Sequence, residues 1–232
     1  MFDVQRSVFD VPKTGMKSLF ITFEGTEGCG KSTQIELLAE RLRALGHRVR
    51  VLREPGGTPI GEELRRTLKH SKVNVAMTYE TELLLMNASR AQLVRETIRP
   101  ALAGGEIVLC DRFYDSTTAY QGYGRGLDLA LVKSVIDFAV GDTRPNLTLL
   151  LHVPAEVSAE RLRSRQSTLP FVRDRIEEGD KYFFARVAQG YEAIAAAEPN
   201  RVRVVSGAGA IEVVCENIWE LVRPVLPRIG RW

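Results

Sequence analysis

The chain has 232 residues, 44% of them hydrophobic and 26% charged, a composition typical of one α/β domain with a large core. Its 32 basic and 29 acidic residues leave a net charge of +3, which is too small to indicate binding to nucleic acid or to a membrane surface. No apolar run reaches the roughly 18 residues of a membrane span, and the N-terminus lacks the apolar core of a signal peptide, so we expect a cytoplasmic protein that binds small anions.

The N-terminal residues 1–15 show no periodic pattern and precede a second methionine, Met16. Segments without an apolar period that lie at a chain end are often poorly ordered. We therefore expect residues 1–15 to be an extension and residues 16–232 to form a single domain.

A phosphate-binding loop follows the first predicted strand, 19–24. It reads Gly25-Thr26-Glu27-Gly28-Cys29-Gly30-Lys31-Ser32-Thr33 and completes the pattern G-x-x-x-x-G-K-[ST]. In this pattern backbone N–H groups surround phosphate oxygens, the lysine neutralises the β- and γ-phosphates, and the hydroxyl ligates Mg²⁺. A helix predicted over 31–45 supplies the strand–loop–helix context that the motif requires. The sequence therefore predicts a site for a nucleoside triphosphate and Mg²⁺.

The rest of the chain alternates strands and helices. Strands are predicted over 48–53, 106–111, 147–153 and 201–205, and helices over 59–69, 78–102, 127–139, 155–165, 179–197 and 211–223. Pro100 is expected to bend the third helix, 78–102, or to end it early. This alternation predicts a P-loop NTPase-type fold: a doubly wound, five-stranded parallel sheet with helices on both faces.

Ligands of such sheets bind at the carboxyl ends of the strands. The turn-rich segment 53–58 follows the second predicted strand, and Asp111 and Arg112 follow the third. A carboxylate at this place would lie next to Mg²⁺, and a guanidinium next to the phosphates.

Five segments together resemble bacterial thymidylate kinases, in their order and spacing as well as in their residues. They are Phe23-Glu24-Gly25 with the loop, Arg53-Glu54-Pro55-Gly56-Gly57-Thr58, Ser89-Arg90-Ala91-Gln92, Asp111-Arg112-Phe113 with Ser116 to Gly122, and Arg144-Pro145-Asn146-Leu147-Thr148-Leu149. The resemblance covers residues 19–220. It implies phosphoryl transfer from ATP to dTMP, giving dTDP and ADP with Mg²⁺, in dTTP biosynthesis, by a homodimer.

On the ATP side, the resemblance implies that Lys31 and Ser32 bind the phosphates and Mg²⁺, with Thr33 beside them. Asp111 would support the metal through water. Arg165 matches the arginine that a lid supplies in those bacterial enzymes whose phosphate-binding loop has none, as here. The lid is expected at about 163–178. From charge alone, the basic run that leads into it is better explained as a solvated helix face, and the resemblance reverses that preference.

On the dTMP side, the resemblance implies that Arg90 and Arg112 bind the phosphate. It also implies that Thr117 and Gln121 contact the edge of the thymine base. Tyr120 would crowd the sugar 2′ position, which favours deoxyribose. The same family positions place Glu27 near the 3′-hydroxyl and Arg53 among the substrate-binding residues.

Met86 departs from the family pattern, because family members carry a phenylalanine against the thymine ring at this position. Methionine packs on a ring less rigidly. A second interpretation treats Met86 as a core residue of the apolar stretch 83–86.

Two other classes of function are compatible with the loop. A P-loop kinase for another nucleoside monophosphate would share the loop, Asp111 and Arg112, but not the segment from Thr117 to Gln121. A non-catalytic nucleotide-binding switch would need no acceptor-side arginines such as Arg90 and Arg112.

Overall fold

The computed structural model describes residues 18–71, 74–168 and 181–227, apart from the side chains of residue 75 and of residues 165–168. The predicted extension 1–15 lies outside this part. So does the predicted lid after residue 168. The predicted division into an extension and one domain with a lid therefore stays a prediction.

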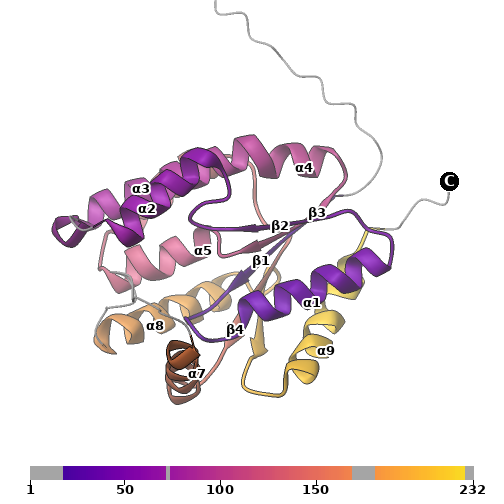
Figure 1. Cartoon of the computed structure of the whole chain (residues 1–232). Helices are drawn as coiled ribbons and strands as arrows, with labels where there is room; N and C mark the ends of the chain where they lie inside the picture. Colours follow the sequence, from indigo (N-terminus) through magenta and orange to yellow (C-terminus); the bar gives the residue numbers. More distant parts are fainter. Residues whose placement is uncertain (1–17, 72–73, 169–180, 228–232) are drawn as a thin grey trace, which may run out of the picture.

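Five strands and a series of helices make up the described chain (Figure 1). The strands are β1 (Leu19–Glu24), β2 (Val49–Arg53), β3 (Ile107–Asp111), β4 (Leu147–His152) and β5 (Val202–Ser206). The α-helices are α1 (Lys31–Ala44), α2 (Pro59–His70), α3 (Tyr79–Leu93), α4 (Arg99–Ala103), α5 (Tyr114–Thr117), α6 (Leu129–Val140), α7 (Ala155–Thr168), α8 (Lys181–Ala197) and α9 (Ile211–Val222). Short 3-10 turns cover Asn74–Ala76 and Arg223–Val225.

The strands form one sheet in the order β2-β3-β1-β4-β5, and every neighbouring pair is parallel. Each predicted strand agrees with its observed bounds to within one residue. The central pair is in register at Phe23 and Asp111, so β1 and β3 end side by side. The predicted five-stranded, doubly wound parallel sheet is confirmed.

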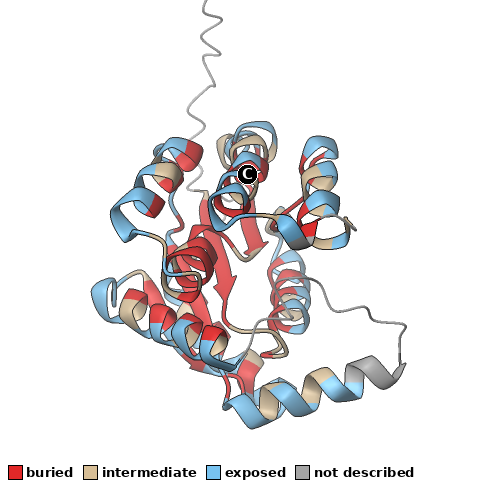
Figure 2. Ribbon diagram, turned by 90° about the vertical axis from the view of Figure 1, so that its left-hand side faces the viewer, coloured by how far each residue is buried: buried red, intermediate tan, exposed pale blue. Residues whose placement is uncertain are grey.

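Alternate residues of β1 face two separate cores. Leu19, Ile21 and Phe23 pack with α1 and α9, whereas Phe20 packs with α3, α4 and α6. Figure 2 shows the result, a buried sheet between helices, most of which bury one face and expose the other. No helix in the described ranges is both long and apolar enough to cross a membrane.

The third predicted helix, 78–102, differs from the prediction. A wider π-helical turn, Val94–Ile98, separates α3 from α4, and the chain stays helical to Ala103. Pro100 therefore does not end the helix early. It lies in the first turn of α4, where its lack of an N–H group costs least.

The segment after β3 forms helical structure that the sequence analysis did not predict. It consists of α5 and the π-helical turn Thr118–Gly124, which packs closely on α8. A Cβ atom on Gly124 would lie 2.7 Å from Phe183 and 2.8 Å from Val187, so only glycine permits this approach. The helical conformation here depends on tertiary packing rather than on a local apolar period.

Glu24, the last residue of β1, is a fully buried carboxyl group that joins three segments. It accepts hydrogen bonds from the backbone N–H of Phe113 (2.7 Å), from Ser116 Oγ (2.5 Å) and from the Tyr191 hydroxyl of α8 (3.0 Å). These bonds fix the entry to α5 and the middle of α8 against the end of the central strand.

Replacing Glu24 with glutamine should change how stability depends on pH. Burial, and then the charge of Asp115, raise the pKa of Glu24 from 4.5 to about 7. The folded protein thus binds this proton more tightly than the unfolded chain does, and the stability that results is complete below the unfolded pKa and lost as the pH rises through about 7. Glutamine stays neutral throughout.

In urea unfolding, we expect the free energy of unfolding of Glu24→Gln minus that of wild type to rise by up to roughly 3 kcal/mol between about pH 5 and about pH 8.5. The difference between the two proteins, rather than either curve alone, isolates this group from others that titrate. A difference that does not change with pH would contradict the account of Glu24.

Candidate active site

The phosphate-binding loop lies between β1 and α1, as predicted. Three of its glycines, Gly25, Gly28 and Gly30, have positive φ. At Gly25 a Cβ atom would lie 2.4 Å from the Leu151 carbonyl oxygen of β4. Only glycine permits both this backbone and this approach, which places the loop at the end of the sheet.

Lys31 begins α1 and is buried, with its Nζ turned back over the loop. It donates to the carbonyl oxygens of Gly25 (3.2 Å) and Thr26 (2.9 Å). The N-cap of α1 is Gly30, which offers no side-chain cap. The unpaired N–H groups of a helix N-terminus and a buried ammonium together are what phosphate oxygens require.

Ser32 and Asp111 meet beside the loop, because β1 and β3 are neighbours. Ser32 Oγ donates to Asp111 Oδ2 over 3.0 Å. Hydroxyl and carboxylate oxygens are ligands that Mg²⁺ accepts. No group of three His, Cys, Asp or Glu side chains in the described ranges could hold a metal by itself, so a cation here would need phosphate oxygens and water as well.

An open cleft adjoins the loop. It brings together most of the side chains predicted to bind the second substrate. Its lining consists of Glu27, Glu54, Pro55, Lys69, Met86, Arg90, Arg112, Ser116, Thr117, Tyr120 and Gln121. The loop and the predicted acceptor residues are therefore parts of one site.

Arg112 joins the loop to the wall of this cleft. Its backbone has φ 67°, and its N–H donates to the Phe23 carbonyl oxygen, which turns the side chain back towards β1. Nη1 then donates to the Gly25 carbonyl oxygen (3.0 Å), and Nη2 lies 2.6 Å from Glu27 Oε1. Nη2 also donates to the Tyr120 hydroxyl over 3.3 Å.

Glu27 is the carboxylate of the loop, and the surrounding cations control its ionisation. Burial would raise its pKa, but the positive charges of Arg112, Lys31 and Lys69 lower it to about 2. Glu27 is thus fully ionised at neutral pH and can only accept hydrogen bonds.

Arg90 lines the cleft, but every nitrogen of its guanidinium already has a protein partner. Nε donates to Glu54 (2.8 Å), Nη1 to Asn87 (2.8 Å) and Thr117 (2.9 Å), and Nη2 to the Phe113 carbonyl oxygen (3.2 Å). In this structure Arg90 orients Thr117. Its contact with a substrate phosphate stays a prediction.

Two other predicted residues have mixed outcomes. Arg53 does not line the cleft; its guanidinium pairs with Glu62 and donates to the Pro55 carbonyl oxygen. Met86 lines the cleft and also packs against the core formed by Tyr120 and α8, so both of its interpretations agree with its position.

Four lining residues were absent from the predicted set. Glu54 and Pro55 belong to the segment 53–58, and Ser116 to the segment before Gly122, both of which the sequence motifs had singled out. The only local signal for Lys69 is the basic end of its helix, and nothing in the sequence places that end at the cleft.

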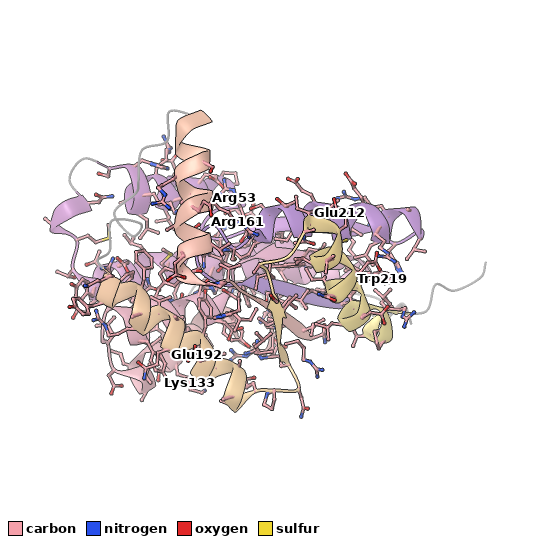
Figure 3. The ribbon with its side chains drawn as sticks, turned by 90° about the horizontal axis from the view of Figure 1, so that it is seen from below. Arg53, Lys133, Arg161, Glu192, Glu212 and Trp219 are labelled. Carbon is pink, nitrogen blue, oxygen red and sulfur yellow. The ribbon has the colours of Figure 1, made fainter. Side chains whose placement is uncertain are left out.

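Helix α7 packs over the outer side of the loop. Ser158 Oγ donates to the Glu27 carbonyl oxygen (2.5 Å), and Arg161 Nη1 lies 3.5 Å from the Gly28 carbonyl oxygen (Figure 3). Arg165 belongs to the same helix, but its side chain is outside the described part, as is most of the predicted lid.

The chain is similar to thymidylate kinases along most of its length. A family model described as thymidylate kinase matches residues 23–218. A thymidylate kinase of Syntrophotalea carbinolica is 49% identical over 203 residues, covering 87% of this chain and 94% of that protein. One from Geobacter sp. (strain M21) is 47% identical over 213 residues, covering 91% and 94%.

Among solved structures, the thymidylate kinase of Ehrlichia chaffeensis matches with a TM-score of 0.71 and 33% sequence identity, covering 88% of this chain and 98% of that one. The shared fold is that of the P-loop NTPases, as the loop and the alternation of strands and helices predicted. The chain belongs to the thymidylate kinase family.

Proposed function

We propose that this protein transfers the γ-phosphoryl group of ATP to dTMP, giving dTDP and ADP. The observation that carries the proposal is the contact of 2.6 Å between Arg112 and Glu27, which joins a nucleoside triphosphate loop to a cleft with the residues expected for dTMP. Such a transfer needs little covalent help; it needs two anions aligned and their charge neutralised.

On the donor side, the loop N–H groups and Lys31 hold the phosphates of ATP. Ser32 would ligate Mg²⁺, with Asp111 supporting it at 3.0 Å from the Ser32 hydroxyl. The metal supplies charge neutralisation on the β- and γ-phosphates. Lys31 exchanges its two backbone carbonyl partners for phosphate oxygens when ATP enters.

On the acceptor side, Arg112 and Lys69 provide positive charge for the dTMP phosphate at the loop end of the cleft. Arg90, predicted to contact the same phosphate, contributes in this structure through Thr117. The ionised carboxylate of Glu27 is suited to accept the hydrogen bond of the sugar 3′-hydroxyl.

The base and sugar then lie along the cleft wall. The Tyr120 ring, which is buried and held by Arg112, crowds C2′ and disfavours a ribose. Met86 packs on the thymine face. Arg165 of α7 supplies a further cation to the transferred group, since the loop has no cation except Lys31.

Lys31→Ala should abolish dTDP formation without unfolding the protein, because the ammonium interacts with loop carbonyls and phosphates rather than with apolar neighbours. We expect kcat to fall at least about a hundredfold, as measured by the release of ADP with dTMP as acceptor. Thermal unfolding, measured alongside, should stay close to that of wild type.

The control is Arg223→Ala, which removes an exposed arginine that pairs with Glu220 and should leave turnover unchanged. Wild type should also prefer dTMP over dUMP, ribothymidine monophosphate, dGMP and dCMP. Activity above about a tenth of wild type in Lys31→Ala, or equal use of all acceptors, would overturn the proposal.

We further propose that the active protein is a homodimer whose subunits meet through α3 and α6. These two helices pack side by side, and their outer surfaces carry the exposed apolar side chains Leu84, Leu131 and Phe138. Phe138 is 82% exposed. Exposed large apolar side chains on neighbouring helices are typical of a protein interface.

Phe138→Glu should convert the dimer into a monomer, because the substitution buries a charge in the proposed interface. Light scattering coupled to gel filtration measures the mass directly. The matched control, Val213→Glu on α9, alters another exposed apolar residue, on the opposite face of the sheet, and should leave the mass unchanged. A wild-type monomer, or a dimeric Phe138→Glu, would contradict the proposed interface.

A further inference from the structure

The carboxamide of Gln121 is held by a buried carboxylate outside the predicted site. Gln121 Nε2 donates to Glu82 Oε1 over 2.7 Å. Glu82, on α3, is completely buried and pairs with Arg125, whose Nη2 lies 3.1 Å from Glu82 Oε2. A carboxylate paired with a guanidinium accepts hydrogen bonds and donates none, so the NH₂ group of Gln121 must face it.

This bond determines which atom of Gln121 a ligand meets. Gln121 lines the cleft, and within the described chain its carboxamide makes no other hydrogen bond. The oxygen and nitrogen of an amide lie on opposite sides of its carbon. With Nε2 turned to Glu82, the carbonyl oxygen Oε1 is the atom left for a ligand, and Gln121 acts as an acceptor.

Thr117, in the same wall of the cleft, is oriented in the opposite sense. Its Oγ1 accepts from Arg90 Nη1 over 2.9 Å, and Arg90 is itself held by Glu54 and Asn87. An arginine has no acceptor, so the Thr117 hydroxyl cannot donate to it. The hydroxyl hydrogen remains available to the cleft, and Thr117 acts as a donor.

We propose that Glu82 is a specificity-positioning residue, which acts through Gln121 to set the hydrogen-bonding polarity of the base-reading wall. A donor beside an acceptor complements the 4-oxo group and the N3–H of a thymine or uracil ring. Cytosine presents the reverse, a 4-amino donor and an N3 acceptor. The inference rests on the proposed function. It adds that the Glu82 carboxylate, which does not itself contact the substrate, excludes dCMP.

Glu82→Gln tests this directly, because an amide can either donate to Gln121 or accept from it. The Gln121 carboxamide is then free to turn. We expect the ratio of kcat/KM for dTMP to that for dCMP to fall at least about tenfold, through a higher KM for dTMP and a lower KM for dCMP, with kcat for dTMP largely retained.

The matched control is Asp115→Asn, which also converts a buried, arginine-paired carboxylate into an amide. Asp115 pairs with Arg201 and lies two residues from Thr117, but it does not line the cleft. We expect Asp115→Asn to lower the thermal midpoint and to leave the dTMP to dCMP ratio unchanged. Thermal unfolding of both variants reports any general loss of structure.

The outcomes separate the two proposals. A wild-type protein that does not phosphorylate dTMP would overturn the proposed function. A wild type that does so, with a Glu82→Gln variant that loses both substrates in equal proportion, would overturn the role of Glu82. If Glu82→Gln is too unstable to assay, Thr117→Val replaces it: loss of the hydroxyl donor should lower the same ratio, and an unchanged ratio would reject the polarity of the wall.

Discussion

The site depends on the contacts that the guanidinium of Arg112 makes with both of its halves. It reaches the phosphate-binding loop at Gly25 and Glu27 and the cleft wall at Tyr120. A parallel sheet with β1 beside β3 makes this geometry available, because the two strands end at the same edge. The left-handed backbone at Arg112 then directs its side chain across that edge.

The same edge is crowded with charge, and the balance of that charge favours anionic ligands. Lys31, Lys69 and Arg112 surround a single loop carboxylate, Glu27, whose pKa they lower to about 2 in spite of its burial. Three residues earlier, at the end of β1, burial raises the pKa of Glu24 to about 7. Two carboxyl groups three residues apart thus differ widely in pKa, because the cations of the cleft dominate at one and burial dominates at the other.

Much of this arrangement was predictable from the sequence, because the motifs that indicate it are short segments of the chain or sets of such segments in a fixed order. The loop motif, the alternating strands and helices, and the residues that follow each strand placed Lys31, Ser32, Asp111 and Arg112 correctly at one edge of the sheet. The family motifs added Thr117, Tyr120 and Gln121, all of which line the cleft.

The features that were missed arise from tertiary packing. The helical segment after β3 is stabilised by its close contact with α8 at Gly124, and the π-helical turn before Pro100 leaves no pattern that a helical period would reveal. Lys69 reaches the cleft only because α2 packs on α3. Arg53 ends β2, at the edge of the sheet where a substrate residue is expected, but its guanidinium pairs with Glu62 and it does not line the cleft.

Calorimetric titration of an Arg112→Lys variant tests the central claim most directly. Lysine keeps the positive charge but cannot span the loop and the cleft as the planar guanidinium does. The account predicts that dTMP affinity falls at least about tenfold, while a non-hydrolysable ATP analogue binds within about threefold of wild type. Unchanged dTMP affinity, or an equal loss for both nucleotides, would contradict the assignment of Arg112 to the acceptor phosphate.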